Sequence, residues 1–179
     1  MLRPTKISQD TFNTIALLAA FCFFLSLIEY IIPKPLPFIR LGISNLPILL
    51  AIDILPFGPF LLLVCAKVIG MGLVSGSLLS YPMIFSFSGS LVSALCMFGL
   101  RKLCKSSVSF IGLSIVGSLT SNFIQIIMAK YIIFGESAIL IGPAFLTLGL
   151  VSGFVMGVFA ERFTMTSIWY KNHVEKNKI

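Results

Sequence analysis

The stretch Phe60-Leu-Leu-Leu-Val-Cys-Ala-Lys67-Val-Ile-Gly-Met-Gly-Leu-Val74 places one lysine in the middle of an otherwise apolar segment. A segment of this kind belongs in a lipid bilayer, where a charged side chain costs several kcal/mol unless it is paired. Lys67 is therefore the leading candidate for a functional residue. It either faces a ligand or forms a structural pair with Glu29, and the two roles are compatible because a ligand can displace Glu29.

The composition of the whole chain is that of a membrane protein. Of its 179 residues, 58% are hydrophobic and only 11% are charged, and the mean hydropathy is +1.06. Soluble domains are roughly one-quarter charged. The net charge of +7 comes from short basic clusters between apolar segments, which indicates membrane orientation rather than nucleic-acid binding.

The pattern of apolar segments predicts an all-α integral membrane protein. We expect a compact bundle of about six transmembrane helices in one domain, residues 1–165, followed by a polar, frayed cytoplasmic tail, residues 166–179. The expected helices cover about residues 12–32, 42–55, 59–73, 83–100, 110–132 and 139–160. The second and third are short for a span of about 20 residues. A re-entrant or steeply set hairpin that lines a cavity is the alternative for this pair.

The basic residues predict the orientation of the bundle. With six spans, nine of the thirteen Lys and Arg residues fall on the side of the two termini. Because cytoplasmic loops carry an excess of basic residues, both termini are expected in the cytoplasm.

Several polar residues from different predicted helices share one depth in the outer half of the membrane. This common depth predicts a polar chamber that binds a substrate, with the candidate residues Glu29, Arg40, Asn45, Lys67, Ser88, Asn122 and Gln125. Asn122 and Gln125 equally fit hydrogen bonding between helices, and serines within helices often bond to their own backbone. Basic residues outnumber Glu29 near the outer face, which favours an anionic or carboxylate-bearing ligand.

Two ladders of small residues predict close helix packing. Gly149, Gly153 and Gly157 recur at every fourth position, and packing inside the bundle is the expected role for this ladder. Ala16 and Ala20 lie in the cytoplasmic half of the first helix, where a partner subunit could dock.

Motifs for catalysis are missing from the sequence. It contains no phosphate-binding loop of the G-x-x-x-x-G-K-[ST] type. Its acidic residues are too widely separated to form an aspartate pair for Mg²⁺ and a diphosphate. The sequence therefore predicts a protein that is not an enzyme and that uses no cofactor and no metal.

Four segments together resemble a known membrane family. They are Pro37-Phe-Ile-Arg-Leu-Gly-Ile-Ser-Asn-Leu-Pro47, Lys67-Val-Ile-Gly-Met-Gly-Leu-Val-Ser-Gly-Ser-Leu78, Phe85-Ser-Phe-Ser-Gly-Ser-Leu-Val-Ser93 and Ser121-Asn-Phe-Ile-Gln125. Their order and spacing resemble the family named heptaprenyl diphosphate synthase component I, also called the Gx transporter family, over nearly all of residues 12–162. The family often has arginine at the place of Lys67 and histidine at the place of Ser121.

This family is in turn similar to the S components of energy-coupling factor (ECF) transporters. The resemblance implies a multi-pass protein of the bacterial plasma membrane that captures a small molecule. It also implies that Ala16 and Ala20 contact a transmembrane coupling subunit, which assembles with ATPase subunits. The alternative is a membrane accessory subunit of heptaprenyl or polyprenyl diphosphate synthesis, as the family name says. A co-purifying ATPase pair would favour the first function, and a co-purifying prenyltransferase the second.

Overall fold

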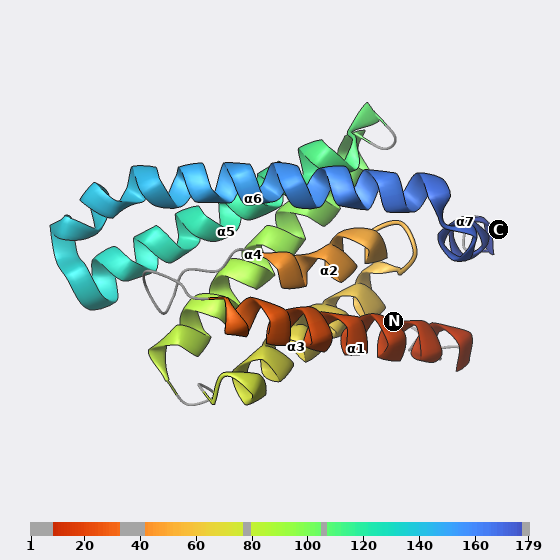
Figure 1. Cartoon of the computed structure of the whole chain (residues 1–179), viewed down its shortest axis with the longest axis horizontal. Coiled ribbons are helices and arrows are strands. Elements are labelled where there is room, and N and C mark those ends of the chain that lie inside the picture. Colours follow the sequence, from red (N-terminus) through yellow and green to blue (C-terminus); the bar gives the residue numbers. More distant parts are fainter. Residues whose placement is uncertain (1–8, 33–41, 77–79, 105–106, 177–179) are drawn as a thin grey trace, which may run out of the picture.

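The computed structural model describes residues 9–32, 42–76, 80–104 and 107–176, and every regular element in this part of the chain is helical (Figure 1). The expected all-α class is thereby confirmed. The main helices are α1 (Gln9–Ile31), α2 (Leu46–Ala51), α3 (Phe57–Val74), α4 (Tyr81–Cys104), α5 (Phe110–Ala129), α6 (Ala138–Thr166) and α7 (Ile168–Lys176). Three short turns, η1 (Ile43–Asn45), η3 (Lys130–Phe134) and η4 (Gly135–Ser137), connect some of them.

Several helices are long and apolar enough to cross a membrane. The segments that meet this condition are Gln9–Ile31, Phe57–Val74, Met83–Cys104 and Phe110–Thr166, of which the last folds back on itself as α5 and α6. Large apolar side chains point outward along these helices, as in Leu140, which is 84% exposed. Such side chains suit contact with lipid, so the chain is a multi-pass membrane protein.

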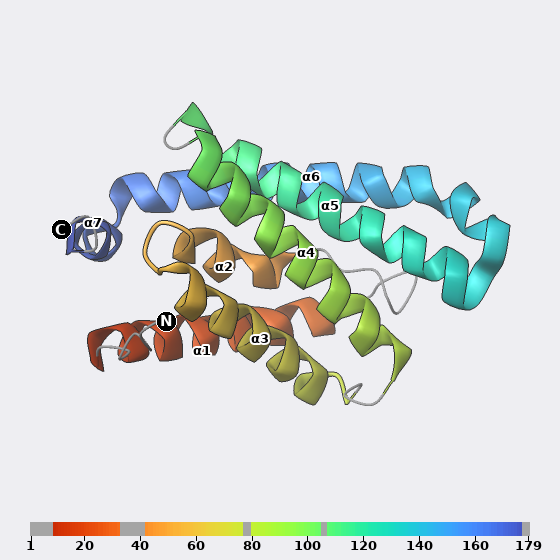
Figure 2. The same ribbon diagram turned by 180° about the vertical axis from the view of Figure 1, so that it is seen from behind.

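The long helices surround the short helix α2. Neighbouring pairs are α1 with α3, α3 with α4, α4 with α5, and α5 with α6, and Figure 2 shows α4 running obliquely between α3 and α5. Helix α2 lies between α1 and α6 in Figure 1 and also contacts α3 and α5. All six of its residues are buried. At 1.5 Å per residue α2 is only about 9 Å long, shorter than the helix expected at residues 42–55, whereas α3 is long and apolar enough to cross a membrane.

The glycine ladder of α6 packs against α5, which confirms the expected internal role. A Cβ atom added at Gly157 would lie 2.6 Å from the Cα atom of Ile111. Added Cβ atoms at Gly149 and Gly153 would collide with the side chains of Asn122 and Ser118, respectively. The two helices are therefore closer together than any larger side chain on this face of α6 would allow.

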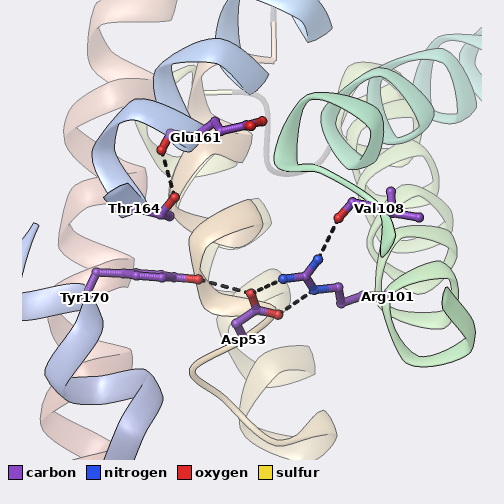
Figure 3. Close-up of polar contacts among 6 residues, drawn as sticks. All are labelled: Asp53, Arg101, Val108, Glu161, Thr164 and Tyr170. Atoms are coloured by element: carbon purple, nitrogen blue, oxygen red, sulfur yellow. Dashed lines mark hydrogen bonds and ion pairs between the residues drawn. The ribbon is translucent and has the colours of Figure 1, made fainter. Parts of the chain in front are cut away.

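A polar network joins the elements at the end of the bundle where α6 ends (Figure 3). Arg101 of α4 donates to both carboxylate oxygens of Asp53, at 2.8 and 2.6 Å, and to the carbonyl oxygen of Val108 at 2.7 Å. The hydroxyl of Tyr170 donates to Asp53 at 3.3 Å. The tail was expected to be frayed, but residues 168–176 form α7, and Tyr170 is only 5% exposed. Tyr170 therefore ties α7 to the turn after α2.

Candidate functional site

Lys67 lies on the inner face of α3 and is 2% exposed. Its Nζ atom donates to Oδ1 of Asn45 at 2.7 Å and to Oγ of Ser90 at 3.0 Å. These two partners come from the start of α2 and from α4. An ammonium group can only donate hydrogen bonds. The oxygen atoms of Asn45 and Ser90 therefore act as acceptors for the buried charge.

The carboxylate of Glu29 binds the turn that precedes α2. Its carboxylate is fully buried and accepts hydrogen bonds from the backbone N–H groups of Gly42 and Ser44, both at 3.3 Å, and from the hydroxyl of Ser44 at 3.1 Å. Gly42 has a φ of 77°, a conformation that glycine adopts without strain. Glu29 therefore fixes the backbone that carries Asn45 toward Lys67.

A closed polar cavity adjoins Lys67. Its volume is about 10 Å³, and it is lined by residues of α3, α4, α5, α6 and the start of α2, namely Gly42, Ser44, Asn45, Lys67, Ser90, Ser118, Ser121, Asn122 and Ser152. A second cavity of about 20 Å³ shares Gly42, Asn45, Ser118 and Ser152 with it. One water molecule needs on the order of 10–15 Å³, so each cavity has about the volume of one water molecule.

Two amide side chains of α5, Asn122 and Gln125, lie at or beside the site. Nδ2 of Asn122 donates to the carbonyl oxygen of Phe145 on α6 at 2.7 Å. Nε2 of Gln125 donates to Oγ of Ser121 at 3.1 Å. Oε1 of Gln125 is buried and accepts no hydrogen bond from any residue that the structure describes. The amide of Asn122 thus joins α5 to α6, and the amide of Gln125 positions Ser121. Oε1 of Gln125 can still accept a hydrogen bond.

The predicted site residues fall into three groups. Lys67, Asn45 and Asn122 line the same cavity. Glu29 and Gln125 adjoin it through Ser44 and Ser121, respectively. Ser88 is half-buried and is not among the residues around the cavity, and Arg40 lies outside the described residues.

Sequence reasoning missed several serines of this cavity. It selected Ser88 on α4, but the serine of that helix that binds Lys67 is Ser90. On α5, the polar residues Ser114, Ser118, Ser121, Asn122 and Gln125 follow one another at helical spacing. That spacing puts them on one face, and it was the signal that could have revealed Ser118 and Ser121.

An apolar groove runs along the outside of α1 in the half of the bundle that contains α7. Its volume is about 410 Å³, and its walls come from α1, α2, α6 and α7, with the residues Leu17, Leu18, Ala20, Phe21, Phe24, Leu50, Phe163 and Trp169. Ala16 and Ala20 are both exposed. The predicted docking surface is therefore accessible and adjoins a concave apolar surface.

Fold and site together define a multi-pass helical membrane protein with a buried, lysine-containing polar cavity. The family model described as heptaprenyl diphosphate synthase component I matches residues 18–163. The chain therefore belongs to this family, as the sequence motifs predicted. No curated protein and no solved structure matches the chain.

Proposed function

We propose that this protein is the substrate-binding membrane component of an ECF-type uptake transporter for an anionic or carboxylate-bearing small molecule. The observation that carries the proposal is the position of Lys67, which is 2% exposed and lines a polar cavity. Ionisable residues within membrane segments are costly and usually mark a binding site or a transport pathway. A carboxylate bound in the cavity would place a negative charge beside Lys67, next to the oxygen atoms of Asn45 and Ser90 that Lys67 contacts.

The partner in this proposal is a transmembrane coupling subunit that assembles with ATPase subunits. Support comes from the exposed pair Ala16 and Ala20 and from the neighbouring groove of about 410 Å³. Small residues let a second helix approach closely, and the apolar groove walls suit an apolar helix. In this proposal the protein lies in the bacterial plasma membrane with both termini in the cytoplasm, where ATPase subunits have access to nucleotide.

The second candidate is a membrane accessory subunit of heptaprenyl or polyprenyl diphosphate synthesis. The family description favours it. The surroundings of two acids favour it less, because the half-buried Asp53 is bound by Arg101 and the buried Glu29 by Gly42 and Ser44. Carboxylates with such partners are not free to hold Mg²⁺ against a diphosphate.

The decisive experiment combines ligand identification with uptake. Native mass spectrometry of the purified protein identifies a retained small molecule, and its accumulation is then measured in cells that carry wild-type protein, Lys67→Met or Asn122→Ala. We expect both variants to fold and to lose most of the uptake. Lys102→Met is the matched control, because Lys102 is exposed.

Two results would contradict the transporter proposal. One is normal accumulation by both folded variants. The other is co-purification of the chain with a prenyltransferase in place of an ATPase pair, which would support the second candidate.

A further inference from the structure

The short helix α2 has a side-chain contact at each of its ends. At its start, Asn45 accepts a hydrogen bond from Lys67 of α3 at 2.7 Å. Just after its last residue, Asp53 accepts hydrogen bonds from Arg101 of α4, at 2.8 and 2.6 Å, and from Tyr170 of α7, at 3.3 Å. Helix α2 therefore runs from the cavity beside Lys67 to the network shown in Figure 3.

The segment between these two contacts is short, regular and buried. Every residue of α2 is buried. The backbone bonding continues past its end, because the N–H groups of Ile54 and Leu55 both donate to the carbonyl oxygen of Ala51, at 3.1 and 2.8 Å. Packed interiors have low compressibility and transmit a displacement to their neighbours. A movement of Asn45 is therefore expected to carry Asp53 with it.

Helix α2 also forms part of the wall of the apolar groove along α1. Leu50 of α2, Ala20 of α1 and Trp169 of α7 all line this groove. Leu50 and Tyr170 belong to one buried apolar cluster, and Trp169 packs against that cluster. The shape of the groove therefore depends on the relative positions of α2 and α7, which Asp53 joins through Tyr170.

We propose that α2 couples the cavity beside Lys67 to the apolar groove, so that a change in the contacts of Asn45 alters the groove. A ligand that takes the place of Asn45 beside Lys67 would release the start of α2, and the wall that contains Leu50 and Trp169 would move with it. The role of this coupling rests on the proposed function, in which the groove receives a helix of the coupling subunit. Occupation of the cavity would then change the affinity for that subunit, and binding of the subunit would change the affinity for the ligand by the same factor.

Trp169 is a native probe for this coupling, because it is the single tryptophan of the chain and lines the groove. Its fluorescence is measured on the full-length protein in detergent, with no ligand and no partner. Asn45→Ala removes the contact with Lys67 without changing the charge of the protein. We expect a red shift of the Trp169 emission maximum and stronger quenching by acrylamide, because release of α2 opens the groove wall to water. Asn45→Ser, a smaller change, takes its place if Asn45→Ala does not fold.

Gln125→Ala is the matched control for Asn45→Ala. Gln125 is also a buried amide beside the cavity, but its Nε2 atom donates to Ser121 within α5. This variant changes the surroundings of the cavity without removing a bond to α2. It should therefore leave the emission of Trp169 unchanged.

A double-mutant cycle gives a second, independent measurement. Substitutions at distant and independent sites have additive effects on stability. Because α2 couples its two ends, the loss of Tm in the double variant Asn45→Ala and Tyr170→Phe should differ from the sum of the single losses by about 2 °C or more. The losses of Gln125→Ala and Tyr170→Phe should add to within about 1 °C.

Two results would overturn the inference: unchanged Trp169 emission in a folded Asn45 variant, or additive losses of Tm in the cycle with Tyr170→Phe. Both would leave the proposed function intact, because uptake could depend on Lys67 without this coupling. Conversely, normal uptake by Lys67→Met and Asn122→Ala would reject the proposed function. The fluorescence and stability measurements use neither ligand nor partner, so they would still decide whether α2 couples the cavity to the groove.

Discussion

Nζ of Lys67 and Oδ1 of Asn45 lie 2.7 Å apart, and this bond joins the transmembrane helix α3 to the start of the buried helix α2. Asn45 reaches that position because Glu29 holds two residues of the turn that carries it, Gly42 and Ser44. The buried cation and the buried carboxylate thus act on the same short turn. Movement of this turn would change the surroundings of Lys67 directly.

The first prediction concerns the orientation of the chain. Reporter fusions after Ile32 and after Leu103 should report opposite sides of the membrane, with the Leu103 fusion in the cytoplasm. The physical reason is that nine of the thirteen basic residues then face inward. Alkaline phosphatase and green fluorescent protein fusions measure this, and identical locations for both fusion points would contradict the predicted topology.

The second prediction concerns the docking surface. Ala16→Leu combined with Ala20→Leu should strongly reduce co-purification of the proposed coupling subunit, because the added side chains keep a partner helix at a distance. Both residues are exposed, so thermal unfolding of the variant should remain close to that of the wild type. Leu148→Phe on α6 is a control on another exposed surface. Unchanged assembly of the alanine variant would show that the partner docks elsewhere.

The third prediction concerns the contact between α5 and α6. Gly157→Ala should lower the free energy of unfolding by about 1–3 kcal/mol, the range for overpacked sites, because its Cβ atom would lie 2.6 Å from backbone atom Cα of Ile111. Gly99→Ala is the control, since a Cβ atom there has no neighbour within 4 Å. Thermal unfolding in detergent compares the two. Similar effects of both substitutions would mean that the helices are not in close contact at Gly157.

The fourth prediction concerns pH. Burial, followed by the nearby charge of Asp53, raises the pKa of Tyr170 above its ordinary value. The neutral hydroxyl is favoured in the folded state, so its stabilising contribution is complete below the unfolded pKa of about 10 and is lost as pH rises above it. Tyr170→Phe should lower the free energy of unfolding by about 1 kcal/mol near neutral pH. The difference from wild type should shrink above about pH 10.

Thermal unfolding of both proteins across this pH range is the measurement for Tyr170. Because other groups also titrate at high pH, the informative quantity is the difference between wild type and Tyr170→Phe. A difference that stays constant through alkaline pH would mean that the hydroxyl proton does not support the contact with Asp53.

Much of the fold could be predicted because apolar length and basic clusters dominate a membrane sequence. The expected helix at residues 110–132 begins, as α5 does, at Phe110, and the break at Pro56 separates α2 from α3 as expected. The helical tail was missed because its short sequence is polar on average. Its order depends on a contact between Tyr170 and Asp53, which are far apart in the sequence.

The candidate site could be predicted in part. A buried lysine and two amides are rare enough in apolar helices to stand out, and Lys67, Asn45 and Asn122 do line one cavity. Serines are common in membrane helices, so their presence alone did not distinguish Ser90 from Ser88. Which serine meets Lys67 depends on the rotation of α4 against α3, and this rotation follows from packing between helices.

The burial of Lys67 also has a consequence for how the protein is made. When α3 leaves the ribosome and meets the membrane, Asn45 has already emerged, but Ser90, 16 residues after the end of α3, is still inside the ribosome. A lysine at the centre of an inserting helix costs about 2.5–3.5 kcal/mol, and the long apolar remainder of α3 must offset this cost. The contact between Lys67 and Ser90 forms only when α4 enters the bilayer. Biosynthesis of this membrane protein therefore passes through a stage at which the Lys67 side chain lacks one of the contacts that bury it in the folded bundle.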